Sequence, residues 1–287
     1  MQIITQSFIK ALFEYKVGNE CGLQFEAKFV HGLEFPSSDA MKLGQWFEYM
    51  CTGQKTKFGH TPEAVRLKPK KATAKQIKDI EVETFNIDEV PHVQGELSKK
   101  YQDALAHVKL FKQMIKAHDY EIVETGERLV DKKLGIQGDV DITVRKRGDK
   151  NAKLRFIDTK FSGLLDNKWD DLGWADESLE YKDKIMIQAV HYKLLGFQKY
   201  GYEPDFYFWV FSSTNTTDCK NIKVIVDEDK FTEHQNIIKQ ARHEFEKQKS
   251  QGWIPRPTPK RCGACLLKDK CEFFVALPQE QIVYYGG

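Results

Sequence analysis

The chain has 287 residues, of which 41% are hydrophobic and 30% are charged, and this balance is typical of a globular protein with a full hydrophobic core. A net charge of +2 excludes a strong basic field over the whole molecule, so any surface for nucleic acid must be local. No apolar run is long enough to span a membrane, and the first residues lack the basic and apolar regions of a signal peptide. We therefore expect a cytoplasmic protein, whose six cysteines are metal ligands or buried thiols rather than disulfides.

Apolar residues at helical spacing predict three helices in the N-terminal part, over residues 6–16, 23–30 and 39–50. The first helix places three apolar side chains on one face: Phe8, Leu12 and Phe13. The third helix carries Glu48, which is either a salt-bridged surface acid or a carboxylate that contributes to a metal site. The choice between these interpretations depends on the rest of the chain.

A basic segment follows, with eight Lys or Arg residues and a single acid, Glu63, between residues 55 and 78. Pro62 and Pro69 require part of this segment to be irregular. The segment is either a solvated basic loop or an arm that contacts the phosphates of a nucleic acid.

The centre of the chain predicts a long helix followed by three strands. The helix is expected over 98–118, and the strands over 121–130, 134–144 and 154–161. Residues 146–151 between the last two strands are rich in turn-forming residues, so we expect these strands to form a hairpin.

Two acidic residues and a lysine lie on this hairpin. Asp141 ends a G-x-x-D sequence on the first strand, and Asp158 and Lys160 form D-x-K on the second. Residues two apart on a strand point to the same face, and pairing of the strands brings Asp141 beside Asp158. Adjacent carboxylates suit a hard cation such as Mg²⁺ or Mn²⁺, whose bound water can attack a phosphodiester while the lysine holds that water. The alternative is a surface hairpin whose charges are solvated or paired.

Beyond the hairpin, an acidic loop over 163–177 is followed by a strong helix expected over 178–197. Gln188 and Tyr192 lie one turn apart on a mostly apolar stripe of this helix. Taken alone, they would be a partly buried glutamine and a core tyrosine. The remaining sequence predicts two strands and a charged amphipathic helix, over 205–213, 223–226 and 231–250.

The C-terminal part contains three cysteines within ten residues, in the pattern C-x-x-C-x5-C: Cys262, Cys265 and Cys271. Their thiolates can face one centre, but tetrahedral Zn²⁺ and a cubane iron–sulfur cluster both require a fourth ligand. The candidates for the fourth ligand are Cys21, Cys51 and Cys219. Cys21 suits ligation best, because it lies in a loop between two expected helices, next to Gly22. Spacing alone does not separate zinc from iron and sulfur, and three unligated thiols are the remaining alternative.

Taken together, these motifs resemble the RecB-type branch of the PD-(D/E)XK nuclease superfamily over nearly the whole chain. They occur in the order typical of that branch: Ser7 and Cys21, Gly44 to Glu48, Gly138 to Asp141, Asp158 to Lys160, Gln188 to Tyr192, and the C-terminal cysteines. The cysteines are similar to those of its iron–sulfur subgroup, which includes CRISPR-adaptation exonucleases and nucleases of phage and bacterial recombination. The resemblance implies a [4Fe–4S] cluster, with Zn²⁺ as the alternative, held by Cys21, Cys262, Cys265 and Cys271.

The resemblance also implies roles for the other motif residues. Four groups would hold one or two Mg²⁺ or Mn²⁺ ions: Glu48, Asp141, Asp158 and the carbonyl of Thr159. Lys160 would serve the attacking water, and Gln188 and Tyr192 would contact DNA and support the active site. Many members of the family have histidine at the position of Glu48, so the chain departs from the common pattern there.

These observations predict an α/β fold with a restriction-endonuclease-like core. A mixed central sheet would be flanked by helices, and the N- and C-terminal segments would be joined by the cysteine-ligated cluster. A single nuclease domain would cover residues 1–287, in three parts: a mainly helical part at 1–120, the catalytic core at 121–250 and the cysteine segment at 251–287.

The implied function is metal-dependent hydrolysis of DNA by an exonuclease in recombination, repair or DNA processing. Its substrate would be single-stranded DNA or duplex ends, and a helicase, a recombinase or another processing protein is the expected type of protein partner. Two alternatives stay open on the sequence. One is a non-catalytic DNA-binding or assembly module with a nuclease fold, and the other is a sequence-specific endonuclease.

Overall fold

The computed structural model describes residues 3–33, 39–52, 92–93, 96–97, 99–162, 165, 179–263, 265 and 267–274. The chain divides into two compact units. The first unit comprises Met1–Gln6, Ser37–Pro62 and Glu83–Ile238. The second unit comprises Ser7–Pro36, Glu63–Val82 and Lys239–Gly287. The expected single domain over the whole chain stays a prediction.

The first unit is built on a five-stranded mixed sheet with the strand order β3-β4-β5-β6-β7. Neighbouring strands are antiparallel except for β5 and β6, which are parallel. A parallel pair requires a crossover connection, and the chain between β5 and β6 contains α6 (Leu179–Tyr200). The strands are β3 (Tyr120–Asp131), β4 (Ile136–Lys146), β5 (Arg155–Ser162), β6 (Asp205–Ser212) and β7 (Cys219–Val224).

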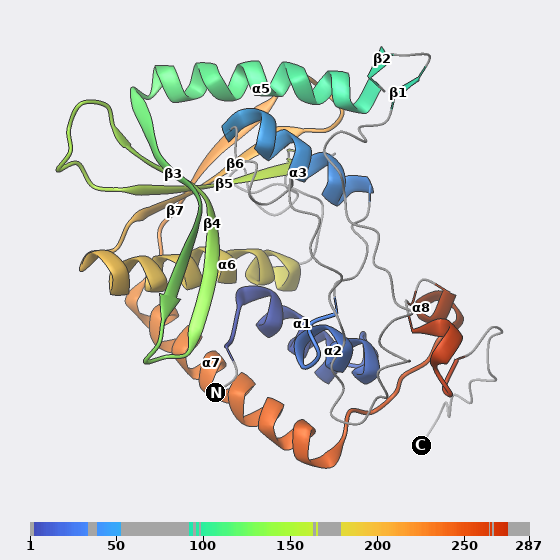
Figure 1. Cartoon of the computed structure of the whole chain (residues 1–287). Helices are drawn as coiled ribbons and strands as arrows, with labels where there is room; N and C mark the ends of the chain where they lie inside the picture. The colour runs from blue at the N-terminus through green and yellow to red at the C-terminus, as the bar shows by residue number, and fades with distance from the viewer. Residues whose placement is uncertain are drawn as a thin grey trace. The chain divides into compact units, whose positions relative to one another are not determined.

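Helices cover both faces of this sheet (Figure 1). On one face lie α3 (Asp39–Thr52) and α5 (Lys99–Ala117), and on the other lies α6. Between α3, α5 and the sheet, Phe47, Phe111 and Trp209 belong to one buried apolar cluster. Since β6 is covered on both sides, its sequence is a continuous apolar run, as expected for a strand in the middle of a layered fold.

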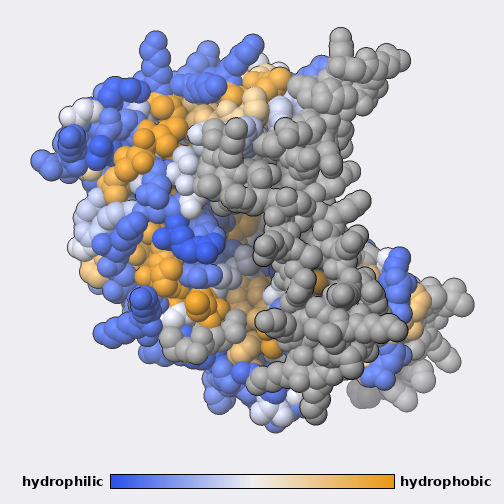
Figure 2. All heavy atoms as spheres, in the orientation of Figure 1, coloured by the Kyte–Doolittle hydropathy of each residue, from blue (hydrophilic) through white to orange (hydrophobic). Residues whose placement is uncertain are grey.

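The outer face of α5 is polar. Its buried side includes Val108 and Phe111, whereas three exposed lysines follow one another at spacings of three and four residues: Lys109, Lys112 and Lys116. Figure 2 shows hydrophilic side chains along the upper edge of the molecule, over this helix. This is the ordinary amphipathic pattern of a helix that covers a sheet. Among the described residues, no helix is both long and apolar enough to cross a membrane.

The second unit has an aromatic core. The ring centroids of Phe8 and Phe25, and those of Phe8 and Phe245, are 5.4 Å apart in both pairs. The ring of Trp253 lies 4.6 Å from that of Phe25. Inclined contacts of this kind are favourable between aromatic rings. The unit contains α1 (Gln6–Lys16), α2 (Gly22–Phe29), the C-terminal part of α7 (Glu228–Gln251), α8 (Pro259–Gly263) and a 3₁₀ turn at Lys268–Lys270.

The predicted α/β fold with a mixed sheet and flanking helices is confirmed, but one strand was misplaced. It was expected over 223–226, whereas β7 covers Cys219–Val224. Because β7 is an edge strand, most of its side chains are only half-buried or exposed, so its sequence lacks a clear apolar signal. Ile225, which the predicted strand included, lies outside β7 and is 81% exposed.

Further differences between prediction and structure concern an exposed side chain and several short elements. Phe13 was expected on the buried face of α1 but is 44% exposed, because it lies about 100° around the helix from the buried Leu12. The two-residue strands β1 (His92–Val93) and β2 (Glu96–Leu97), and the five-residue α8, are too short for periodicity to reveal. The basic segment 55–78 and nearly all of the loop 163–177 lie outside the described residues.

Candidate active site and cysteine pocket

The strands β4 and β5 separate at the point where their acidic residues begin. Their ladder ends at the pair formed by Ile142 and Ile157. The next residues toward the open end are Asp141 on β4 and Asp158 on β5. The backbone N–H of Thr159 donates a hydrogen bond of 3.2 Å to Oδ2 of Asp141. This fork, formed by the diverging ends of β4 and β5, places the two carboxylates beside each other, as the hairpin pattern predicted.

Asp158 is a buried carboxylate with 2% of its surface exposed. One of its oxygens forms an ion pair with Nζ of Lys160, and the other accepts a hydrogen bond from Nε2 of Gln188 on α6. Burying a carboxylate without such partners is costly, and these contacts offset part of the cost of burying Asp158. The side chain of Lys160 is 33% exposed, so the fork is open to solvent on the side of its ammonium group.

Lys160 lies in the field of three acids. Desolvation lowers the pKa of Lys160, but the charges of Asp158, Asp141 and Glu48 and the hydrogen bond to Asp158 hold the pKa above its ordinary value. Lys160 is therefore an ammonium group at neutral pH and does not act there as a general base. Its interaction with Glu48, a buried residue of α3, shows that this third carboxylate belongs to the same electrostatic group.

The helix α6 contributes Gln188 and Tyr192, one turn apart. The ring of Tyr192 packs against Gly138, where a Cβ atom would lie only 2.4 Å from Cε1 of the ring. The glycine of the G-x-x-D sequence is therefore required by the close approach of the ring. Burial and the charges of Asp141 and Asp158 raise the pKa of Tyr192, and a hydrogen bond with Gln188 acts in the opposite direction.

The donors around the fork are carboxylate oxygens, which Mg²⁺ and Mn²⁺ prefer. In the part of the chain that the structure describes, no group of three or more His, Cys, Asp or Glu side chains is close enough to hold a metal ion directly. Glu48, Asp141 and Asp158 are thus donors arranged around one lysine rather than a closed coordination sphere.

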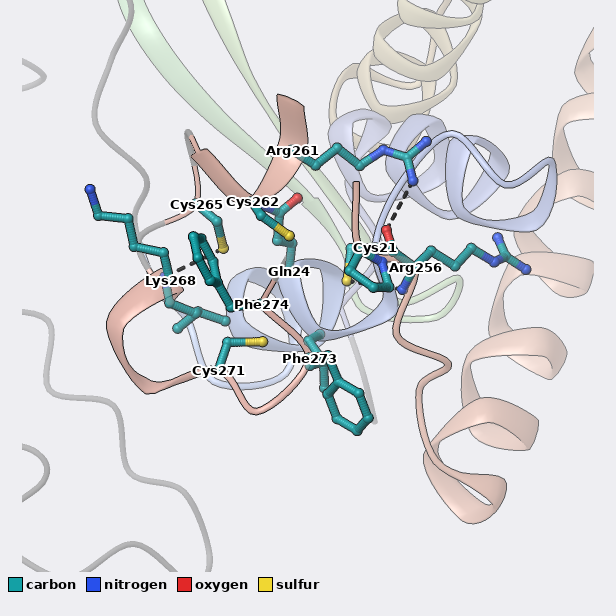
Figure 3. A pocket seen from close by; sticks show the side chains of 13 residues that line it. Cys21, Gln24, Arg256, Arg261, Cys262, Cys265, Lys268, Cys271, Phe273 and Phe274 are labelled. Atoms are coloured by element: carbon teal, nitrogen blue, oxygen red, sulfur yellow. Dashed lines mark hydrogen bonds between the residues drawn. The ribbon is translucent and has the colours of Figure 1, made fainter. Parts of the chain in front are cut away.

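Four of the six cysteines line one pocket of the second unit, around a cavity of about 20 Å³. These are Cys21, Cys262, Cys265 and Cys271. Figure 3 shows their four sulfur atoms around a common space, with Cys21 on one side and the C-terminal cysteines on the others. Of the other candidates, Cys51 is buried in the core of the first unit, and Sγ of Cys219 lies 3.6 Å from Sδ of Met114. The structure therefore brings Cys21 to the C-x-x-C-x5-C pattern.

Two of these sulfurs accept hydrogen bonds from the backbone. The N–H of Arg256 donates to Sγ of Cys21, and the N–H of Leu267 donates to Sγ of Cys265, both at 3.4 Å. Thiolate ligands are suited to zinc and to iron–sulfur clusters. The pocket therefore gathers four thiol side chains, although no three of these described cysteines lie close enough to hold a single metal ion directly.

Sequence reasoning did not single out the basic residues of this pocket. Arg256, Arg261 and Lys268 line it together with the cysteines. Arg256 stands between two prolines, Pro255 and Pro257, in the connector after α7. A residue held between prolines has a restricted, extended backbone, and this restriction was the signal available in the sequence.

Comparisons with known proteins bear on the fold. No family model matches the chain, and no curated protein matches it. The crystal structure of a presumed exonuclease from Eubacterium rectale aligns with a TM-score of 0.60 at 15% sequence identity, covering 98% of this chain and 91% of that chain. The two chains share a fold. A second match, the crystal structure of SSO0001, covers 61% of this chain and 71% of that chain at 17% identity. Its TM-score is only 0.31.

The fold shared with the presumed exonuclease agrees with the nuclease-like α/β core expected from the motifs. The alignment covers 98% of this chain, so the likeness is not limited to the central sheet. At 15% identity it concerns the fold alone, and the roles of individual residues rest on the geometry of the fork and of the cysteine pocket.

Proposed function

We propose that this chain is a metal-dependent DNA nuclease of the RecB-type branch of the PD-(D/E)XK superfamily. The observation that carries the proposal is the fork, where buried Asp158 is held by Lys160 and Gln188 beside Asp141. A purely structural hairpin has no need to bury a carboxylate next to a second one, because each buried charge costs free energy. The fold shared with a presumed exonuclease supports the same conclusion.

In this proposal, one or two Mg²⁺ or Mn²⁺ ions are held by Glu48, Asp141, Asp158 and the carbonyl of Thr159. When bound, such ions lower the pKa of a water and neutralise charge on the phosphate. Gln188 fixes the orientation of the Asp158 carboxylate through its amide hydrogen bond. Lys160, which is protonated, donates a hydrogen bond to the attacking water and stabilises negative charge on the phosphate oxygens. Tyr192 supports the fork by packing against Gly138.

We propose in addition a [4Fe–4S] cluster on Cys21, Cys262, Cys265 and Cys271, with Zn²⁺ as the alternative. The support is the convergence of these cysteines on one pocket and the backbone hydrogen bonds to two of the sulfurs. Protein purified without oxygen should be brown and contain iron and sulfide. Colourless protein that contains zinc would establish the alternative.

The proposed role is that of an exonuclease in recombination, repair or DNA processing, which acts on single strands or duplex ends. A helicase, a recombinase or another processing protein is the type of partner that we propose for such a role. The support is the presumed exonuclease that shares the fold over 98% of this chain.

Digestion of DNA tests the nuclease proposal. Purified protein is incubated with end-labelled linear DNA and with circular DNA, single-stranded and double-stranded, in the presence of Mg²⁺, Mn²⁺ or EDTA. We expect the protein to degrade linear DNA only when a metal ion is present, and to leave circular DNA intact. Asp158→Asn and Lys160→Ala should each lower the rate by at least about 100-fold, because each removes charge that the site supplies to the transition state.

Asp139→Asn is the matched control. Asp139 lies two residues before Asp141 on the same strand, but its carboxylate is exposed and accepts a 2.8 Å hydrogen bond from Nε of Arg128. This variant should keep the wild-type rate. Cleavage of circles at the rate of linear DNA would favour an endonuclease. Undiminished cleavage by both Asp158→Asn and Lys160→Ala would overturn the proposed active site, and no cleavage of any DNA by the wild type would favour a non-catalytic module.

A further inference from the structure

The connector that follows α7 holds Cys21 through a single backbone donor. Pro255 and Pro257 have no N–H group, so Arg256 carries the only backbone donor of these three residues. That N–H donates to Sγ of Cys21 at 3.4 Å. Because the prolines restrict the backbone on both sides of Arg256, the direction of this donor is fixed by the sequence itself.

The guanidinium group of Arg256 binds the end of α1. It donates a hydrogen bond to the carbonyl of Tyr15, and its Cζ lies 4.8 Å from the centre of the Tyr15 ring. The last carbonyls of a helix have no partners within the helix, and they lie at the negative end of its dipole. Arg256 thus supplies both a hydrogen bond and a positive charge where α1 requires them.

Arg261 completes this contact from α8. Its Nη1 donates to the carbonyl of Arg256 at 3.0 Å (Figure 3). Its Nη2 donates to the carbonyl of Gly18, also at 3.0 Å. One planar guanidinium therefore joins the residues after α1 to the connector that carries the donor for Cys21. A lysine ammonium group is a point charge on a flexible stem and does not reproduce such a fork.

The backbone next to Cys21 is also held by a close contact. The N–H of Gly22 donates to the carbonyl of Ile254 at 3.1 Å, and a Cβ atom on Gly22 would lie 2.5 Å from that carbonyl oxygen. Cys21 is thus fixed at its sulfur by Arg256 and at the following residue by Ile254.

We propose that Arg256 and Arg261 form an arginine clamp, which positions Cys21 opposite Cys262 and determines how firmly the cysteine pocket retains its metal group. The inference rests on the proposed metal group of the pocket and adds two positioning residues to it. Residues that orient metal ligands through hydrogen bonds typically change metal affinity by about 10- to 100-fold when they are removed. We expect Arg256→Ala and Arg261→Ala to release the metal faster by a factor of this order.

Metal retention of the full chain tests the clamp. Wild type, Arg256→Ala, Arg261→Ala, Arg256→Lys and Arg261→Lys are purified without oxygen. Iron, sulfide and zinc are measured for each protein, and the release of metal into excess EDTA is followed with time. Circular dichroism establishes that each variant is folded. The lysine variants should lose metal nearly as fast as the alanine variants, because they keep the charge but not the planar fork.

Lys260→Ala is the matched control. Lys260 precedes Arg261 on α8, is exposed, and is not among the residues that line the cysteine pocket. It should retain metal as the wild type does. Folded arginine variants with wild-type retention, or equally fast loss from Lys260→Ala, would overturn the clamp. A wild-type chain that contains neither iron nor zinc would instead overturn the proposed metal group, and the clamp with it.

Discussion

The geometry of the fork of β4 and β5 follows from the short spacing of its acidic and basic residues along these two neighbouring strands. The D-x-K spacing predicted that Asp158 and Lys160 share a face of one strand, and the two groups form an ion pair. The sequence also favoured Asp141 as the neighbour of Asp158, and the hydrogen bond from Thr159 to Asp141 agrees with it. Such local relations are predictable because the strand period and the hairpin fix them.

Contacts between distant segments were not predictable in the same way. The hydrogen bond from Gln188 to Asp158 joins α6 to β5. Helical spacing alone made Gln188 a partly buried glutamine, and only the family resemblance implied that it supports the site. Likewise, Gly138 stood out only as part of a motif. A glycine is needed at this position because the ring of Tyr192 packs against its Cα, and that contact depends on how α6 packs on the sheet.

Gly138→Ala should therefore destabilise the fold. The added Cβ would lie 2.4 Å from the ring of Tyr192, so the ring or the strand must move. Such overpacking costs about 1–3 kcal/mol, and the displaced Tyr192 should also reduce nuclease activity. Unfolding in urea measures the loss of stability.

The control is Gly44→Ala in α3. Apart from its chain neighbours and the backbone of its own helix, no atom of the described residues lies within 4 Å of a Cβ built on Gly44. Alanine inside a helix is favoured over glycine by up to about 1 kcal/mol, so this variant should be as stable as the wild type or more so. If Gly138→Ala proved as stable as Gly44→Ala, the close packing of Tyr192 would be wrong.

At the scale of elements, α6 is the helix that positions the site, and two polar networks fix it to its surroundings. Near its C-terminus, Lys199 and Tyr200 donate to the buried carboxylate of Glu127 on β3, which also accepts a hydrogen bond from Thr143. Buried polar groups of this kind are stable only when fully paired. The helix was predictable from its apolar stripe, but these partners were not, since they lie on other elements.

The second network contains two buried histidines. Nε2 of His191 lies 3.0 Å from the carbonyl of Gln137, an acceptor, so His191 donates there and accepts at Nδ1 from Nε2 of His234 at 3.0 Å. Burial lowers the pKa of His191 to about 4, and burial together with the neighbouring His191 lowers that of His234 to about 3. Both histidines are therefore neutral in the folded protein at mild acidity.

This pair predicts a loss of stability in mild acid. The folded-state pKa values of about 4 and about 3 lie below the ordinary value of 6.5, so the unfolded chain binds more protons as the pH falls below 6.5. Stability is thus present above pH 6.5 and is lost on acidification. Between pH 7 and pH 5 each histidine should remove about 2 kcal/mol from the free energy of unfolding.

His234→Gln isolates this effect. Glutamine can still donate to His191 but does not titrate, so the difference in unfolding free energy between pH 7 and pH 5 should shrink by about 2 kcal/mol. His243→Gln, at an exposed position of α7, should leave that difference unchanged. Equal pH dependence in wild type and His234→Gln would contradict the neutral buried pair.

At the scale of the whole molecule, the second unit is assembled from both ends of the chain. Ser7–Pro36 and Lys239–Gly287 contribute its aromatic core and the cysteine pocket. Bringing such distant segments together costs loop-closure entropy, and a crosslink between them acts against that cost. The cysteine spacing grouped three of these cysteines, and the loop position of Cys21 favoured it over Cys51 and Cys219. The fold agrees, because Cys21 lines the pocket and the other two belong to the first unit.

Cys265→Ser should therefore reduce stability before it affects the chemistry of the fork. Metal binding at a site that is absent from the unfolded chain adds its free energy to folding, so losing one ligand should lower the melting temperature by at least about 5 °C. Iron or zinc content should fall with it. Digestion of DNA by the fraction that stays folded should continue, since the carboxylates and Lys160 belong to the first unit.

Cys219→Ser provides the comparison for this change. Its sulfur lies beside Met114 in the first unit and is not among the residues that line the cysteine pocket, so the variant should keep its metal content. Replacing a half-buried thiol by a hydroxyl costs little by comparison, so a small shift in melting temperature is expected. Loss of metal from Cys219→Ser but not from Cys265→Ser would reverse the assignment of the ligands. Loss of metal from Cys265→Ser alone would support a metal group in this pocket that links residues 7–36 to residues 239–287.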